Sequence, residues 1–341
     1  MPLSRSLSLC LFALALVAAA CGGSPPEDRT TVADTLTVYS GRDEEFIGAL
    51  FERFELETGV ELEVRYGDSA ELAATILEEG EASPADVFVA QDAGSLGAVA
   101  DAGLFTPLDQ EVLDRVDARF RSPEGLWVGT SGRARVLAYN TEAVDEAELP
   151  GTVFDLTDPE WKGRIGFPPT NASFQAFVAA MIVTEGQGAT RSFLEGLAAN
   201  DPVLYEDNSS TVLGLAAGEI DVGLVNHYYL YELEAEEGDI PVANHFFAAG
   251  DPGALVNTAG AAILRTSEEP QAAGRLVDYL TGEPGQTFFA TETFEYPVVP
   301  DYEPSVDLVP LEEIESPDVD LSDLGGTLEP ALLLLAEVGL L

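Results

Sequence analysis

The segment Val60-Glu61-Leu62-Glu63-Val64-Arg65-Tyr66 alternates apolar and polar side chains with a period of two residues. This alternation is typical of a β-strand with one buried face. Residues 43–57, which precede it, repeat apolar side chains at helical spacing up to the stop signal Gly59. After it, Asp68-x-x-Glu71 resembles a capping box that opens a further helix. The sequence therefore predicts a strand between two helices.

The same alternation continues in both directions along the chain. Strands are expected at 36–40 and 86–90 and a helix at 92–102, which predicts a parallel sheet covered by helices on both faces. Ligands of such sheets bind in loops beyond the carboxyl ends of the strands, here the loops with Arg42-Asp43 and Gln91-Asp92. A second alternating unit is expected from 136–139 to about residue 256, with strands near 165–167, 203–205 and 222–225, and helices from Ser173, Thr190, Ser210 and His227. A strand at 259–264 and helices at 271–280 and 328–338 complete the prediction.

The first 34 residues are typical of a secreted protein. A basic residue, an apolar core and a small-residue run end before Cys21, so residues 1–20 are interpreted as a signal peptide. The run resembles a bacterial lipobox, which predicts lipidation of Cys21 and a tether over residues 21–34. The alternative is an ordinary secreted protein with a stray cysteine. Cys10 lies inside the signal, so no disulfide is expected in the mature protein.

The charge balance is strongly acidic, with 61 Asp and Glu against 15 Lys and Arg and a formal net charge of -46. Such a surface repels nucleic acid and anionic membranes, so neither is expected as a partner. It suggests a salty habitat, in which ions screen the self-repulsion. Biased genome composition is the alternative, although it would explain the scarce lysines and not the excess of carboxylates. With two histidines and no Gly-x-Ser-x-Gly elbow, the chain is not expected to be an enzyme.

The segment Asn226-His227-Tyr228-Tyr229-Leu230-Tyr231 follows a predicted strand and opens a predicted helix. Asn226 is a suitable N-cap, which would place Tyr228 and Tyr229 in the first helical turn. At an open helix end two neighbouring phenols can reach one point, and a trivalent cation such as Fe(III) can displace their protons. The alternative is that both rings are aromatic packing.

Several motifs together resemble a known family. They are Tyr39-Ser-Gly-Arg42, Ser83-Pro-Ala-Asp-Val-Phe88, Ser131-Gly-Arg-Ala-Arg-Val136, Pro169-Thr-Asn-Ala-Ser-Phe174 and the tyrosine segment. Their order and approximate spacing are similar to those of the ferric-iron-binding proteins of bacterial iron ABC importers, over nearly all of residues 35–340. The resemblance implies an α/β, two-domain periplasmic-binding-protein fold with hinge strands and a central ligand cleft. It implies one domain of residues 35–137 with 258–341 and a second of residues 138–257.

The resemblance also implies the site residues. Tyr228 and Tyr229 match paired phenolate ligands of ferric iron, and a synergistic anion, carbonate or another, would complete the site. The anion is expected at Arg42, Arg133, Asn171, Ser173, Asn208 and Asn226. Arg42 has the alternative of a surface charge on a turn.

Three positions depart from the family pattern. Asp43 stands where many members have His, Gln91 where some have Glu, and Phe174 where others have a third Tyr. Asp43 and Gln91 are therefore candidate metal ligands, and Asp43 is equally well explained as the N-cap of the helix that it opens.

The resemblance implies capture of ferric iron and delivery to an ABC permease by a monomer. The expected location is extracytoplasmic, at the cell membrane through the lipid anchor only. One alternative keeps the scaffold and changes the solute to thiamine, a polyamine, a phosphonate or a sugar phosphate. A purely structural surface lipoprotein is the other.

Overall fold

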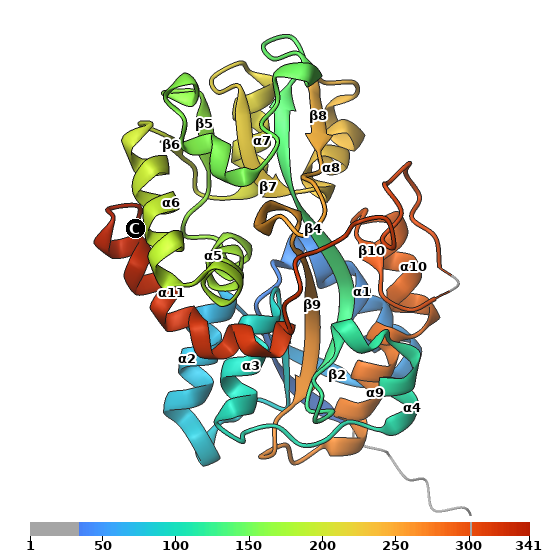
Figure 1. Cartoon of the computed structure of the whole chain (residues 1–341). Helices are drawn as coiled ribbons and strands as arrows, with labels where there is room; N and C mark the ends of the chain where they lie inside the picture. Colours follow the sequence, from blue (N-terminus) through green and yellow to red (C-terminus); the bar gives the residue numbers. More distant parts are fainter. Residues whose placement is uncertain (1–33, 301) are drawn as a thin grey trace, which may run out of the picture. The chain divides into compact units, whose positions relative to one another are not determined.

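The longest strand, β4 (Val128–Asn140), belongs to two groups of strands (Figure 1). Its first half pairs antiparallel with β9 (Val256–Ile263), and its second half with β7 (Val222–Asn226) and β8 (Val242–His245). The sequence predicted only 136–139 of this strand, because the residues before them are polar or small. All of β4 is buried, so its polar residues lie in the interior between the two groups.

The computed structural model describes residues 34–300 and 302–341. The remaining described strands are β1 Thr35–Ser40, β2 Glu61–Tyr66, β3 Val87–Ala90, β5 Ile165–Phe167, β6 Val203–Leu204 and β10 Tyr296–Pro297. The α-helices of this part are α1 Glu44–Thr58, α2 Ser69–Glu79, α3 Ala93–Asp101, α4 Gln110–Arg115, α5 Ala172–Glu185, α6 Gln187–Ala199, α7 Asn208–Ala216, α8 Tyr228–Glu237, α9 Pro270–Thr281, α10 Glu283–Thr291 and α11 Gly325–Glu337.

The sheet has the strand order β2-β1-β3-β9-β4-β7-β5-β6, and β8 and β10 also pair with β4. The expected parallel pairing is confirmed among β1, β2 and β3 and among β5, β6 and β7. It is wrong at the centre, where β9 runs antiparallel to both β3 and β4. The chain returns through β9 from the second group of strands to the first. It therefore enters the first group from the end opposite to that from which β1, β2 and β3 start, which makes β9 antiparallel to them.

Two expected helix caps are wrong, although the helices themselves are confirmed. Asp68 precedes α2 but makes no side-chain capping bond within the described chain. Asn226 is the last residue of β7, and His227 takes the N-cap position of α8, also without a side-chain cap. Tyr228 and Tyr229 are nevertheless the first two residues of α8, as expected.

The C-terminal helix α11 packs against α3 and α5, which come from distant parts of the sequence (Figure 1). Helix α10 was not predicted, because Gly282 and Pro284 at its start are typical of a turn. No helix in the described part of the chain is long and apolar enough to cross a membrane. The predicted signal, Cys21 and the tether up to residue 33 lie outside the described residues, and the two domain boundaries stay predictions.

Candidate metal and anion site

Tyr228 and Tyr229 lie with their rings stacked at the start of α8. The ring centroids are 4.2 Å apart at an interplanar angle of 29°, and both residues are buried. Phe46 of α1 meets the two rings edge-on, with centroids at 6.3 and 5.9 Å. Aromatic packing therefore accounts for the rings, while the chemistry of the pair rests on the two phenol oxygens.

The environment of the pair keeps both phenols protonated when no cation is present. Burial raises the pKa of Tyr228, and Arg133 and Arg42 oppose this rise. The pKa of Tyr229 is raised further, by burial first and then by the neighbouring Tyr228. A ligand that binds the phenolate oxygens must therefore displace protons.

Arg133 extends from the middle of β4 into this environment. It is 1% exposed, and none of its three guanidinium nitrogens has a hydrogen-bond partner among the residues that the structure describes. Its nearest carboxylate oxygen is Oε1 of Glu295, 3.7 Å from Nε. A buried guanidinium in this state is unfavourable unless an anion satisfies it, so Arg133 fits the expected anion-binding role.

Arg135 lies two residues further along β4 and was not predicted as a site residue. Its Nη2 donates to Ser173 Oγ at 3.1 Å and its Nη1 to the carbonyl of Leu224 at 3.3 Å. The guanidinium lies over the rings of Phe174 and Phe177, at 5.9 and 5.7 Å. Burial lowers the pKa of Arg135 to about 9, because no carboxylate in the described chain pairs with it. The spacing of two residues on a strand, which places two side chains on one face, could have revealed it.

Arg42 has a different environment. Its Nη1 and Nη2 donate to the two carboxylate oxygens of Glu295 at 2.8 and 2.9 Å, and both side chains are buried. Burial alone would lower the pKa of Arg42, but Glu295 outweighs it and raises the value. The surface-charge interpretation of Arg42 is therefore wrong. Within the described residues its Nε lacks a partner, so Nε is a donor available to an anion.

The start of α5 lies beside Arg135. Oδ1 of Asn171 accepts from the backbone N–H and the hydroxyl of Ser173, at 3.0 and 2.6 Å, and so caps the helix. The same hydroxyl accepts from Arg135, which connects the helix start to β4. Asn226 ends β7 opposite Arg135 in the antiparallel register. Three of the expected anion-side residues are thus brought to one place.

Asn208 is fully buried at the first position of α7. Both polar atoms of its side chain lack a hydrogen-bond partner within residues 34–300 and 302–341. Helix α7 packs against α8, whose first residues are the two tyrosines. No hydrogen bond of the structure joins Asn208 to Arg133, so its place in an anion site remains a prediction.

The two candidate ligands from the first part of the chain are less enclosed. Asp43 is exposed at the N-cap position of α1, and its side chain makes no capping bond to the described chain. The capping explanation is therefore wrong for its side chain, and the carboxylate is available to a ligand. Although the residue as a whole is exposed, its carboxylate is partly desolvated, which raises the pKa of Asp43, and Arg42 opposes the rise. Gln91 is half-buried beyond β3, its backbone N–H donates to Ser69 Oγ at 2.9 Å, and its side chain makes no hydrogen bond to the residues that the structure describes.

A pocket of ≈ 350 Å³ opens beside Tyr229 and Phe46. Four of the side chains that line it are carboxylic acids, namely Glu45, Glu232, Glu236 and Glu292. Burial, and then the charge of Glu295, raise the pKa of Glu232 to about 9. Glu232 is therefore neutral at pH 7, and the other three acids make the approach to the tyrosines acidic, which favours a cation. No cluster of three His, Cys, Asp or Glu suited to a metal occurs in the described chain, so any metal site here depends on the phenols.

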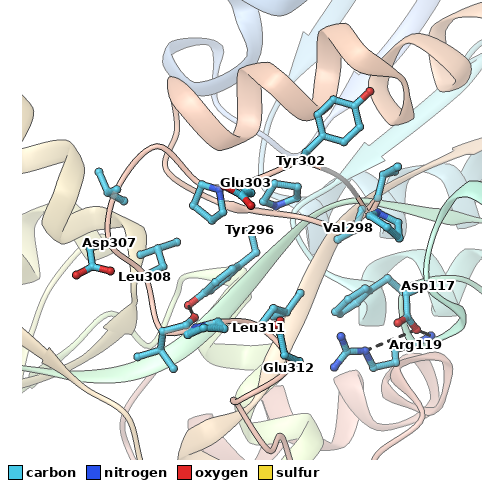
Figure 2. A pocket seen from close by; sticks show the side chains of 18 residues that line it. Asp117, Arg119, Tyr296, Val298, Tyr302, Glu303, Asp307, Leu308, Leu311 and Glu312 are labelled. Atoms are coloured by element: carbon cyan, nitrogen blue, oxygen red, sulfur yellow. Dashed lines mark hydrogen bonds and ion pairs between the residues drawn. The ribbon is translucent and has the colours of Figure 1, made fainter.

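A second pocket, of ≈ 700 Å³, is formed mainly by residues 296–312 (Figure 2). Arg119 pairs with Asp117 at 3.6 Å on one side of it, and Tyr302 and Glu303 lie on the other. Tyr296 lines this pocket and donates through its hydroxyl to Val309 O at 2.7 Å. None of the predicted ligands lines this pocket, so it is separate from the tyrosine pair.

His227 has a structural place next to the tyrosines. Its Nδ1 accepts from the N–H of Ala134 at 3.2 Å, and its Nε2 lies 3.2 Å from the carbonyl of Phe294. Burial lowers the pKa of His227 to about 4, so the ring is neutral and donates from Nε2. The ring is buried and joins β4 to the segment before β10.

Comparison with known proteins identifies the family and the fold. Residues 82–318 match the family described as bacterial extracellular solute-binding protein. An Fe(3+)-binding periplasmic protein of Serratia marcescens is 33% identical over 309 residues, 90% of each chain. The crystal structure of iron-bound HitA from Pseudomonas aeruginosa has a TM-score of 0.85 and 37% identity, over 90% of this chain and 99% of that one. A Trichodesmium protein in complex with iron and citrate has a TM-score of 0.75 and 30% identity, over 89% and 99%. The predicted two-domain α/β fold of periplasmic binding proteins is confirmed.

Proposed function

This chain belongs to the bacterial extracellular solute-binding proteins, and we propose that the solute it captures is ferric iron, held by Tyr228 and Tyr229 together with an anion. One observation carries the proposal. Two stacked, buried phenols lie beside Arg133, whose guanidinium has no hydrogen-bond partner in the described chain, and near Arg135, with which no described carboxylate pairs. An aromatic pair needed only for packing would not require buried arginines beside it.

The phenols supply hard anionic oxygens. Their raised pKa values keep them neutral until iron arrives, and iron then displaces a proton from each. Arg133 stabilises the phenolate form of Tyr228, because its positive charge opposes the rise in pKa. The affinity for iron should therefore fall as the pH falls, since protons and iron compete for the same oxygens.

The anion would bind next to the phenolates. Ferric iron with two phenolates keeps one net positive charge, which adds to those of Arg133 and Arg135. We propose Arg133 as its main partner, with help from Asn208, Arg135 and the start of α5. Carbonate and phosphate both suit such donors, because a guanidinium offers parallel N–H groups to an oxyanion.

The remaining coordination positions are proposed for the first part of the chain. Asp43 has a carboxylate without a capping bond, and Gln91 has a neutral amide oxygen. Hard oxygen donors of this kind are suited to Fe(III). The two sets of ligands would then come from opposite sides of β4 and β9.

A second solute class is favoured by one observation, the acidic pocket beside Tyr229. Three of its four acids, Glu45, Glu236 and Glu292, would also attract an organic cation such as a polyamine, whereas Glu232 is neutral at pH 7. The two classes differ in their optical signature, because only a phenolate bound to iron gives a visible charge-transfer band.

Delivery and location complete the proposal. The protein would release iron to an ABC permease outside the cytoplasm, as a monomer attached to the membrane through a lipid on Cys21. Anchoring is tested by Cys21→Ser, which should move the protein from the membrane fraction to the soluble fraction. Retention of this variant in the membrane fraction would disprove the anchor and leave the iron site unaffected.

The proposed site is tested by titrating ferric salt into protein stripped of carbonate and phosphate. The visible band should develop only after bicarbonate or phosphate is added, and spermidine should produce none. In Arg133→Ala the iron affinity with anion present should fall about 100-fold, as expected for lost charged hydrogen bonds. Arg119→Ala, which removes an exposed arginine paired with Asp117, is the matched control. Full affinity without any anion would mean that Asp43 and Gln91 complete the shell alone.

A further inference from the structure

Glu295 is the carboxylate at the centre of the buried arginines. It is fully buried and accepts four hydrogen bonds, two from Arg42, one from Ser131 Oγ at 3.1 Å and one from Thr293 Oγ1 at 2.8 Å. Burial alone would raise the pKa of Glu295, but Arg42 and Arg133 outweigh it and lower the value. Glu295 is therefore ionised at neutral pH and fixed in position by its donors.

Arg133 is close to this carboxylate but not bonded to it. The distance from Nε to Oε1 is 3.7 Å, and within the described chain no nitrogen of Arg133 has a hydrogen-bond partner. The contact is thus a charge interaction without an aligned bond. Arg133 can turn its donors to another anion while it remains in the field of Glu295.

The backbone on both sides of Glu295 is fixed, so the carboxylate cannot move with the side chain of Arg133. Phe294, the preceding residue, has a positive φ of 53°, and its carbonyl lies 3.2 Å from His227 Nε2. Tyr296, the next residue, pairs with Gly132 of β4. Glu295 is therefore held from both sides at a fixed distance from the arginines.

A charge count shows what this carboxylate does. Arg42, Arg133 and Arg135 are buried and bring three positive charges, and Glu295 brings one negative charge, so two positive charges remain while the phenols are protonated. Removing Glu295 would raise the balance to three and strengthen the attraction for any small anion. Asp92 is a further buried acid near Arg133, and its carboxylate accepts from the backbone N–H and hydroxyl of Ser95, both at 2.8 Å. Its charge is the same with and without Glu295, so it does not alter the difference of one charge that Glu295 makes.

We propose that Glu295 is a positioning residue that takes the place of the bound anion while iron is absent, so that the protein takes up the anion only together with iron. This inference rests on the proposed ferric-iron function. Glu295 orients Arg42 through a bidentate pair and partly neutralises Arg133. Iron adds positive charge that outweighs the repulsion between Glu295 and the anion. Without iron, this repulsion weakens the binding of phosphate alone.

The test measures inorganic phosphate binding to iron-free protein by isothermal titration calorimetry in carbonate-free buffer. Glu295→Gln keeps the shape and removes the charge, and it should bind phosphate at least about tenfold more tightly than wild type. Adding Arg133→Gln to this variant should abolish the gain. Glu295→Asp shortens the side chain but keeps the charge, and it should bind phosphate less tightly than Glu295→Gln. Equal phosphate affinity of wild type and a folded Glu295→Gln would overturn the inference.

Glu295→Gln leaves Arg42 without its partner and can be too unstable for calorimetry. Its thermal unfolding is then followed at increasing phosphate, because a ligand that binds the native state raises the melting temperature. The inference predicts a marked rise for the variant and little change for wild type. A variant that phosphate does not stabilise would show that Glu295 is only a structural partner of Arg42. Since no iron is added, these results are independent of whether wild type shows the ferric band.

Discussion

Two buried arginines of the site, Arg42 and Arg135, have opposite electrostatic environments. On the Arg42 side, the guanidinium is matched by Glu295 in a bidentate pair, and its pKa is raised. On the Arg135 side, the guanidinium lies over Phe174 and Phe177 without a carboxylate, and its pKa falls to about 9. The positive charge of Arg42 is thus balanced by a carboxylate, whereas the positive charge of Arg135 is not. The difference indicates that the Arg42–Glu295 pair stabilises the fold, whereas the unbalanced charge of Arg135 favours binding of an anionic ligand.

The largest expected effect comes from making the same substitution on both sides. Arg42→Met leaves Glu295 buried with fewer partners and should lower the free energy of unfolding by about 3–5 kcal/mol. Arg135→Met removes a buried charge that has no counterion, so the loss should be no more than about 1 kcal/mol. Urea denaturation of the iron-free proteins measures both. Similar losses in the two variants would contradict the division into a structural side and a ligand side.

The Arg42 side should also be the acid-sensitive side. The folded-state pKa of Glu295 lies below its ordinary value, so its contribution to stability is present above about pH 4.3 and is lost as the pH falls through the folded value. Each unit of pKa depression is equivalent to about 1.4 kcal/mol. The free energies of unfolding of wild type and Glu295→Gln should therefore converge between pH 6 and pH 3. A constant difference across this range would show that the carboxylate is not ionised through a lowered pKa.

A smaller effect is expected from Asp43, next to Arg42. Its carboxylate makes no capping bond, so Asp43→Asn should leave the stability of the iron-free protein nearly unchanged. It should weaken ferric iron binding about tenfold, or about 1.4 kcal/mol, if one hard anionic ligand is lost. Competition with a chelator measures the affinity, and Glu44→Gln is the matched control for a lost charge on the same helix end. If Asp43→Asn lowered the stability and left the iron affinity unchanged, Asp43 would be a helix cap and not a metal ligand.

The local elements could be predicted because their signals are local. Apolar spacing located the helices and strands from residue 36 to 102, and the strand before the tyrosines placed them at a helix start. Arg135 could also have been predicted as a site residue, because it stands two residues from Arg133 on one strand and therefore on the same face. It was not predicted, because the family resemblance implied an anion-binding role for Arg133 and none for Arg135.

Glu295 could not be predicted in the same way. It is 253 positions from Arg42, and nothing near it in the sequence distinguishes it from the many other acids of the chain. Only the fold brings the end of α10 to the loop after β1. The polar half of β4 was missed for a related reason, because its burial depends on partners from distant segments.

The central claim, that the phenols of Tyr228 and Tyr229 bind ferric iron, is tested most directly by the visible spectrum of the iron-loaded protein. Phe keeps the rings packed against Phe46 and removes only the oxygens, so Tyr228→Phe and Tyr229→Phe should stay folded. Wild type with ferric salt and phosphate should show a phenolate-to-iron charge-transfer band. Each single variant should lose intensity and shift the band, and the double variant should show no band. An unchanged band in both single variants would contradict the assignment.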